Sequence, residues 1–381
     1  NQTESENVRL SLQSKSIGED THTLRSLDWD RSRFDIEFGL KNGTTYNSYI
    51  IQGEKNVLID TSHLKFNEIW FDELKQTIDP SNVDYLIVSH TEPDHSGLIG
   101  NLLILNNNIE IIASKVAIKF LKDQLHMPFK YREVKTGDEL DLGKNKLSGV
   151  HHKFQFISAP NLHWPDTIFS YDQGTNILFT CDAFGLHFCS NELFDQDASI
   201  LAEDFRFYYD CLMGPNARSV LQAIKKMNEL EEVKLIGVGH GPVLKYNVPL
   251  WIDNYQEWSS KRSKGNSYAA VCYISQYGFC DRLSQSISHG IGKTDAQVQL
   301  IDLQATDEQE LSALINEANA VVMPSWPCDG SQELQNSIGT VLACLKQNQW
   351  IGIYEPYGGN EEPIDVVSEK LRRLGQKEAF K

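Results

Sequence analysis

Residues 89–97, which read Ser-His-Thr-Glu-Pro-Asp-His-Ser-Gly, constrain the fold of this chain more than any other stretch. The apolar run at residues 85–89 predicts a buried strand, and a helical pattern begins near Gly97. Four side chains that can bind metal lie in the turn between them: His90, Glu92, Asp94 and His95. So many imidazoles and carboxylates above an apolar core are best accommodated around cations. We therefore expect a metal-binding turn at a strand end.

Length and charge limit the alternatives. A chain of 381 residues, 40% of them hydrophobic, can form two domains with separate cores. The net charge of −17 argues against nucleic acid or an anionic membrane as the main partner. No apolar run reaches the length of a membrane span, and residues 1–23 lack the apolar core of a signal peptide. The seven cysteines include no Cys-x-x-Cys motif, which favours a reducing cytoplasm over a disulfide framework.

The first half of the chain alternates strand and helix patterns. Residues 1–22 are polar and predict a loose N-terminal arm. Residues 23–60 show strand patterns separated by Asn42-Gly43 and Gln52-Gly53 turns, and residues 67–78 show an amphipathic helix. Helices and strands then alternate, and short strands return over residues 131–179. This order predicts a four-layered α/β sandwich over residues 23–260 rather than one doubly wound sheet.

Three further positions add to the candidate ligands of the turn. His163 lies between two strand patterns, Asp182 follows the strand at residues 177–182, and His240 ends the apolar run 233–240. A single histidine at such a place is more often structural, but three strand-end positions beside the cluster favour metal. Four imidazoles and three carboxylates are too many for one tetrahedral ion and suit two ions that share a bridging ligand. The hard carboxylates favour iron and oxygen chemistry over simple hydrolysis.

These motifs carry a resemblance. His90-x-Glu92-x-Asp94-His95 resembles the metallo-β-lactamase-fold signature His-x-His-x-Asp-His, with glutamate in place of the second histidine. Together with Leu-His-Trp-Pro-Asp at His163, Thr-Cys-Asp-Ala-Phe-Gly at Asp182 and Gly-His-Gly-Pro at His240, the chain resembles the flavodiiron proteins from about Thr23 onward. The resemblance implies a metallo-β-lactamase-like αββα sandwich with one iron held by His90, Glu92 and His163, a second held by Asp94, His95 and His240, and Asp182 bridging.

Other polar residues near these motifs need separate interpretation. His151 and His152 lie in residues 148–153, which look like an exposed hairpin insertion, and we exclude them from the metal site. Tyr46, Trp164 and His187 are candidates to line an oxygen pocket, although core packing explains the first two as well.

The second half of the chain shows a different pattern of strands and helices. Residues 259–267 are polar and basic and predict a domain linker. From residues 268–381, apolar strands alternate with helices, which predicts a parallel sheet with ligands at the carboxyl ends of its strands. Four strands are recognisable, so a doubly wound flavodoxin-like sheet would lack its fifth strand.

Three loops after these strands resemble the FMN-binding loops of a flavodoxin-like domain. Residues 275–280 open a helix with a serine and a glycine, as a phosphate-binding turn does, and the other two loops offer aromatic side chains for stacking on a flavin. Cys280 stands where a hydroxyl residue is common, and ordinary turns of a parallel sheet are the alternative. The candidate FMN contacts are Ser275, Gln276, Tyr277, Gly278, Phe279, Cys280, Pro324, Ser325, Trp326, Pro327, Cys328, Asp329, Gly330, Glu355, Tyr357, Gly358 and Gly359.

The resemblance implies an oxidoreductase that reduces O2 to water at a di-iron centre, with electrons that come from NAD(P)H through FMN. It also implies a head-to-tail homodimer or pairing with a homologous flavodiiron subunit. Residues 26–39 resemble flavodiiron proteins of photosynthetic organisms that continue into an NAD(P)H:flavin reductase domain, which we do not find here. Three alternatives remain: NO reduction to N2O at the same centre, a zinc hydrolase of the same fold, and a non-catalytic subunit. Glu92 argues against the hydrolase.

Overall fold

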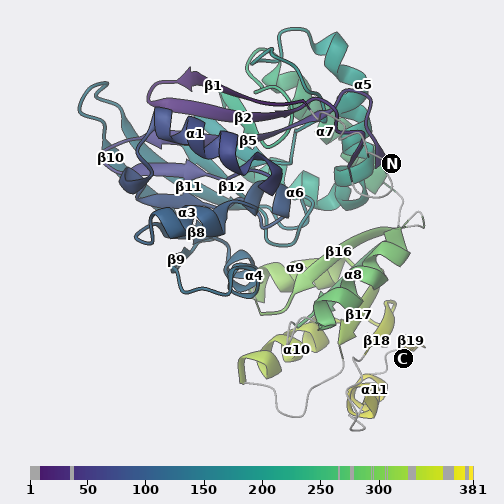
Figure 1. The fold of residues 1–381 in the computed structure, drawn as a ribbon. Helices are drawn as coiled ribbons and strands as arrows, with labels where there is room; N and C mark the ends of the chain where they lie inside the picture. The colour runs from purple at the N-terminus through teal and green to yellow at the C-terminus, as the bar shows by residue number, and fades with distance from the viewer. Residues whose placement is uncertain are drawn as a thin grey trace, which may run out of the picture. The chain divides into compact units, whose positions relative to one another are not determined.

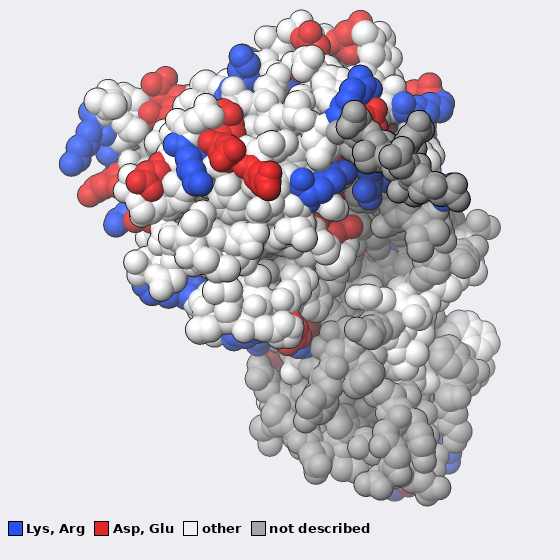
Figure 2. Space-filling view, viewed as in Figure 1, with Lys and Arg blue, Asp and Glu red and all other residues white. Residues whose placement is uncertain are grey.

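The computed structural model describes residues 9–34, 38–264, 267–274, 279–292, 294, 296–304, 306, 308–324, 332–354, 364–373 and 377–380. The chain divides into two compact units. The first contains Asn1–Gly214 and Val220–Trp258, and the second contains Pro215–Ser219 and Ser259–Lys381. Among the described residues, no helix is both long enough and apolar enough to cross a membrane. Figure 2 shows basic and acidic side chains interspersed on one face of the first unit, without a large patch of either sign.

Two sheets form the centre of the first unit (Figure 1). The larger has the order β1-β2-β5-β6-β7-β8-β9, antiparallel up to β6 and parallel beyond it. Its strands are β1 (Leu10–Gly18), β2 (Thr21–Asp28), β5 (Thr44–Gln52), β6 (Asn56–Ile59), β7 (Tyr85–Ile87), β8 (Glu110–Ala113) and β9 (Lys130–Glu133). The smaller sheet runs in chain order through β10 (Glu139–Lys144), β11 (His151–Ser158), β12 (Ile168–Asp172), β13 (Ile177–Cys181) and β14 (Leu235–Val238). A short ribbon pairs β3 (Arg33–Phe34) with β4 (Phe38–Gly39).

Alternation of side chains along the strands explains why the two sheets stack. Ile50 of β5 faces one apolar cluster, whereas its neighbour Ile51 faces another, because successive side chains point to opposite faces. The cluster that contains Ile51 joins both sheets and includes Phe156 of β11 and Phe179 of β13. These alternating apolar positions form the core between the sheets.

Helices cover the outer face of each sheet. On the larger sheet, α1 (Asn67–Thr77), α3 (Ile99–Leu105) and α4 (Lys115–Leu125) pack around Trp70 and Leu86. On the smaller sheet, α5 (Ala198–Tyr208), α6 (Ala217–Met227) and α7 (Val248–Ser263) pack around Phe205 and Trp251. The shorter helical segments are η1 (Leu64–Phe66), η2 (Pro80–Asn82), α2 (Pro93–Ser96), a π-helix at Tyr209–Met213 and η4 (Gly214–Asn216). Helix, sheet, sheet and helix layers confirm the predicted αββα sandwich.

Two predictions about the borders of the first unit were wrong. Residues 10–18 are not a loose arm but form β1, which pairs with β2 from Leu10 opposite Asp28 to Gly18 opposite Thr21. This strand looked unstructured because most of its residues are polar, and only Leu10 and Leu12 pack on the helix-side cluster and Ile17 between the sheets. The predicted linker at residues 259–267 is helical as far as Ser263, where Lys261 and Arg262 suit the negative end of the α7 dipole.

The second unit is a parallel sheet with the order β16-β15-β17-β18-β19. Its elements are β15 (Tyr268–Tyr273), α8 (Phe279–Gly292), β16 (Gln297–Asp302), α9 (Glu308–Glu317), β17 (Ala320–Pro324), α10 (Gln332–Cys344), β18 (Trp350–Tyr354), α11 (Ile364–Arg373) and β19 (Lys377–Phe380). This strand order is that of flavodoxin-like sheets, which confirms the predicted fold class. The prediction that the fifth strand is missing was wrong, because β19 pairs with β18. Four residues, half of them charged, give too weak a strand pattern to recognise.

Candidate metal centre

Two buried carboxylates hold the ligand-bearing turn that follows β7. Asp60, at the end of β6, accepts a hydrogen bond from the Ser89 backbone N–H at 2.7 Å. Asp166 accepts two, from the Thr91 backbone N–H at 2.9 Å and from the Thr91 hydroxyl at 2.6 Å. Burial raises the pKa of both carboxyls above the usual value. Sequence analysis assigned neither residue, although Asp166 ends the Leu-His-Trp-Pro-Asp motif and Asp60 ends a predicted strand.

The remaining ligands come from loops beyond the smaller sheet. His163 lies in the turn before β12, Asp182 directly follows β13, and His240 lies two residues after β14. Gly239 allows these loops to approach: a Cβ there would lie 2.8 Å from Cε1 of His95 and 2.9 Å from Sγ of Cys181. No larger residue fits without displacing a ligand.

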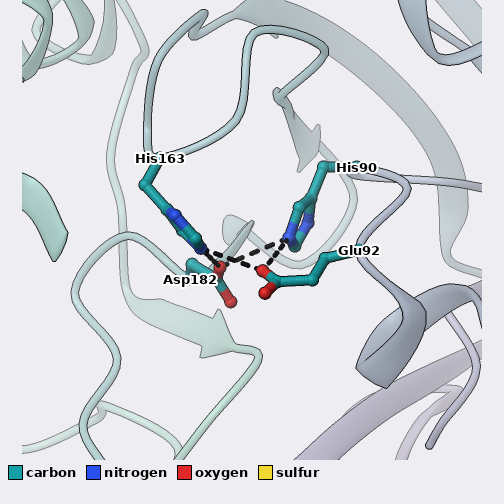
Figure 3. Close-up of side chains that lie close together, drawn as sticks. All are labelled: His90, Glu92, His163 and Asp182. Carbon is teal, nitrogen blue, oxygen red and sulfur yellow. Dashed lines mark hydrogen bonds and ion pairs between the residues drawn. The ribbon is translucent and has the colours of Figure 1, made fainter. Parts of the chain in front are cut away.

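The first group of ligands contains His90, Glu92, His163 and Asp182, which point toward one another (Figure 3). Nε2 of His163 lies 2.9 Å from Oε2 of Glu92 and 3.0 Å from Oδ2 of Asp182. Nε2 of His90 lies 3.3 Å from each of the same two oxygens. The four donor atoms lie within 4.8 Å of one another, close enough to hold one ion.

The second group contains Asp94, His95 and His240. Nε2 of His240 lies 3.3 Å from Oδ2 of Asp94, and the two Nε2 atoms of His95 and His240 are 3.1 Å apart. Asp182 also reaches this group, because its Oδ1 lies 3.0 Å from Nε2 of His95 and 3.3 Å from Nε2 of His240. One oxygen of Asp182 therefore faces each group, as a bridging carboxylate requires.

The electrostatics of this pocket fit metal ions. Burial lowers the pKa of His163 and of His240, yet the neighbouring carboxylates outweigh it and raise both to about 10. Burial also opposes ionisation of Glu92, but His163 lowers the pKa of this carboxyl. The pocket thus demands positive charge. The facing Nε2 atoms of His95 and His240 can share at most one proton, whereas both can donate lone pairs to a cation.

A backbone carbonyl on the side away from the pocket fixes the tautomer of His240. Nδ1 of His240 donates a hydrogen bond to the Thr45 carbonyl at 2.7 Å, so Nε2 presents its lone pair to the pocket.

Cys181 lies close to His95 and Asp182, and these three side chains form a third possible group of metal ligands, which the sequence motifs did not indicate. Burial raises the pKa of Cys181 well above its usual value, which keeps the side chain a thiol.

The three residues proposed to line an oxygen pocket all lie beside ligands. The ring of His187 is 4.8 Å from that of His240, the ring of Tyr46 is 5.7 Å from His240, and the ring of Trp164 is 6.0 Å from His90. Burial lowers the pKa of His187 well below its usual value, so its imidazole is neutral.

The prediction that His151 and His152 are both exposed was wrong for His152. Nδ1 of His152 lies 2.8 Å from Oδ2 of Asp172, and its Nε2 lies 3.0 Å from Oδ2 of Asp20. Two carboxylates from separate elements compensate this buried imidazole. His151 is exposed and pairs with Asp141.

The candidate FMN contacts lie almost entirely outside the described residues. Pro324 ends β17, and Phe279 and Cys280 begin α8, although their side chains are not described. The rest fall in three undescribed segments, 275–278, 325–331 and 355–363. Each segment follows the carboxyl end of a parallel strand: β15, β17 or β18.

Comparisons with known proteins agree with this geometry. Residues 44–241, which contain all seven ligands, match the family model described as ODP family beta lactamase. The chain is 50% identical to diflavin flavoprotein A 1 of Synechocystis, over 98% of this chain and 64% of that protein. It is also 50% identical to putative diflavin flavoprotein A 3 of Nostoc, over 99% of this chain and 65% of that protein. It therefore spans less than two thirds of the length of these relatives.

A solved structure decides the family. The metal-soaked Flv1 flavodiiron core from Synechocystis is 31% identical, with a TM-score of 0.71 over 98% of this chain and 92% of that one. The chain belongs to the flavodiiron proteins. This confirms the resemblance drawn from the sequence motifs. Rubredoxin oxygen:oxidoreductase from Desulfovibrio gigas, at 23% identity and a TM-score of 0.61, shares the flavodiiron fold over 96% of this chain and 91% of its own.

Proposed function

We propose that this flavodiiron chain is an oxidoreductase that reduces O2 to water at a pair of iron ions. The observation that carries the proposal is the placement of Asp182, whose two carboxylate oxygens face two separate groups of buried ligands. His90, Glu92 and His163 would hold one ion, and Asp94, His95 and His240 the other. Three of the seven candidate donors are carboxylates, which are hard ligands. The set therefore differs from the histidine-rich and cysteine-rich sites typical of zinc.

Bound iron would supply electrons to oxygen, and the surrounding residues would control geometry and protons. The Thr45 carbonyl orients His240, and the buried carboxylates of Asp60 and Asp166 hold the turn that carries four of the ligands. Tyr46 stays protonated, because burial raises the pKa of its phenol, and its hydroxyl donates to Asp28. Reduction of O2 to two waters consumes four protons and four electrons, and these protons would come from water held near Trp164 and Tyr46 rather than from a phenol whose pKa is raised.

The electrons would come from FMN bound at the carboxyl ends of β15, β17 and β18, where flavodoxin-like sheets bind their ligands. NAD(P)H is the proposed ultimate donor. A head-to-tail homodimer, or a pair with a homologous flavodiiron subunit, would bring the flavin of one chain to the irons of another. The names of the relatives support flavin and iron, since two are diflavin flavoproteins and one is a flavodiiron core.

Anaerobic purification of the full chain, with metal and flavin analysis, tests the proposal. We expect two irons and one FMN per chain, and consumption of O2 by the chemically reduced protein without release of peroxide. Faster consumption of NO than of O2 under matched conditions would instead identify an NO reductase. Zinc in place of iron, together with ester or phosphodiester hydrolysis, would contradict an oxidoreductase.

A further inference from the structure

A cavity of about 340 Å³ lies beside the metal centre, in the first unit. Residues from three segments line it: Gly39, Leu40 and Lys41 before β5, His187 after the Asp182 loop, and the end of α5 through Tyr208 to Asp210. None of the seven metal ligands lines this cavity. His187 and Tyr208 separate it from His240, because their rings lie 4.8 Å and 6.1 Å from the His240 ring.

The inner wall of the cavity carries polar atoms without partners. His187 is 6% exposed and Tyr208 is 1% exposed. Nδ1 of His187 is hydrogen-bonded to the Thr44 hydroxyl at 2.7 Å, but its Nε2 has no partner, and neither has the hydroxyl of Tyr208. Unpartnered polar atoms are rare in buried positions, and these two lie on the residues between the cavity and His240, where a passing water can pair with them. Leu40 and Phe207 give the lining an apolar side that suits a small uncharged molecule.

The charged groups of the outer wall are already paired. Lys41 lies 2.6 Å from Glu203, and Arg206 lies 2.8 Å from Asp210. Asp204 accepts a hydrogen bond from the Asn42 amide at 2.9 Å. Because two cations face three carboxylates, the wall has no excess positive charge that would attract an anion. The wall therefore disfavours anions, and its paired charges leave the cavity open to small neutral molecules.

We propose that this cavity is the vestibule through which a neutral diatomic molecule, O2 or NO, reaches the metal centre and through which product water leaves, with His187 as the side chain that controls passage. The proposal rests on the proposed function for its substrate. The ring of His187 is packed between Phe34, at 4.2 Å, and the Tyr208 and His240 rings. A molecule that crosses from the cavity to the ligands must displace this ring.

Gly39 offers a way to plug the vestibule without disturbing the ligands. A Cβ built at Gly39 meets no atom within 4 Å, and the residue is not among those with positive φ. Gly39→Trp should therefore be accommodated at little cost to folding, and a crystal structure of the variant shows whether its indole fills the cavity. Leu147→Trp is the matched control. Leu147 is 98% exposed and does not line the cavity, so an indole there leaves the cavity open. Leu40→Trp is a second plug should Gly39→Trp fail to fold.

Two measurements on these variants test the vestibule. In xenon-pressurised crystals of the metal-free protein, we expect xenon in the cavity of the parent and of Leu147→Trp, and none in the plugged variant. In the iron-loaded full chain, we expect the plug to raise KM for O2 or NO at least about fivefold and to change kcat at saturation less than about twofold. Unchanged iron content would show that the centre itself is intact.

The outcomes separate this inference from the proposed function. No xenon in the parent cavity, or an unchanged KM in a variant whose crystal shows the indole filling the cavity, would overturn the vestibule. If the parent consumes neither O2 nor NO, the proposed function fails, and the xenon experiment still decides whether the cavity admits small neutral molecules.

Discussion

At the scale of single residues, Asp182 is the side chain that both groups of candidate metal ligands share. Asp182→Asn keeps the shape of the side chain but removes its charge, and it turns one oxygen into an amide nitrogen that cannot bind a cation. We expect metal content to fall from two ions per chain to one or none, and turnover to fall by at least about 100-fold. Elemental analysis and O2 consumption measure the two effects.

Asp172 provides the control for this substitution. It is as fully buried as Asp182 but pairs with His152 on β11 rather than with a metal ligand. Asp172→Asn should retain two ions, although it lowers stability. Two ions and normal turnover in Asp182→Asn would contradict the assignment of a shared carboxylate.

Asp166 holds the turn that carries four of the candidate ligands, and through that turn it would support a bound metal. Asp166→Ala removes both hydrogen bonds to Thr91 and should weaken metal binding about 10- to 100-fold, as loss of a supporting partner commonly does. Competition with a chromophoric chelator measures the affinity. Thr91→Val is the graded comparison: it removes only the hydroxyl and keeps the backbone N–H, so its effect should be the smaller one. Unchanged metal affinity in Asp166→Ala would contradict a role of Asp166 in holding the turn.

The sequence contained enough to predict which seven side chains would converge, because each lies at or beyond the carboxyl end of a strand, where loops of one sheet edge meet. It did not reveal Asp60, Asp166 or the Thr45 carbonyl. These groups act through single hydrogen bonds to backbone or ring atoms, and such bonds depend on distances between loops that no spacing in the chain records. The wrong prediction for His152 has the same origin, since its two carboxylate partners are distant in sequence.

At the scale of elements, His152 ties the β1–β2 turn to the smaller sheet, because it lies between Asp20 of that turn and Asp172 of β12. Burial lowers the pKa of His152, but the two carboxylates outweigh it and raise the pKa above the usual value. A raised folded-state pKa means that the stabilisation is complete below about pH 6.5 and is lost as pH rises through the folded-state pKa. His152→Gln should therefore cost about 3 kcal/mol at pH 6, and the cost should shrink at higher pH.

Urea unfolding of parent and variants from pH 6 to pH 9 measures this dependence. The neighbouring His151 supplies a matched control, because it also pairs with a carboxylate but both partners are more than half exposed. His151→Gln should change the free energy of unfolding by less than about 1 kcal/mol at every pH. Indistinguishable behaviour of the two variants would show that His152 does not hold the turn through its charge.

The elements that the sequence failed to predict are edge strands. β1 lies at one end of the larger sheet and β19 at one end of the second unit's sheet. An edge strand pairs on one side only and can expose polar side chains, so its apolar signal is weak. Central strands such as β5 and β7 are covered on both faces, and their aromatic and aliphatic residues, such as Tyr49, Ile50 and Ile51 of β5, made them predictable.

At the scale of the whole molecule, the two units divide the proposed chemistry. All seven candidate metal ligands belong to the first unit, which has its own apolar cores on and between its two sheets. The order of patterns along the chain predicted this division, since a mixed sandwich changes to regular strand–helix alternation after residue 267. The FMN contacts remain predictions, because their loops lie outside the described residues.

A fragment of residues 1–264 tests this division of labour. We expect the fragment of this chain to unfold in one cooperative transition and to bind two irons, because every ligand and its supporting hydrogen bonds are present. It should carry no flavin, whereas the full chain should carry one FMN. Iron bound by the full chain but not by the fragment would mean that the centre needs the second unit. Flavin retained by the fragment would contradict FMN binding at the loops after β15, β17 and β18.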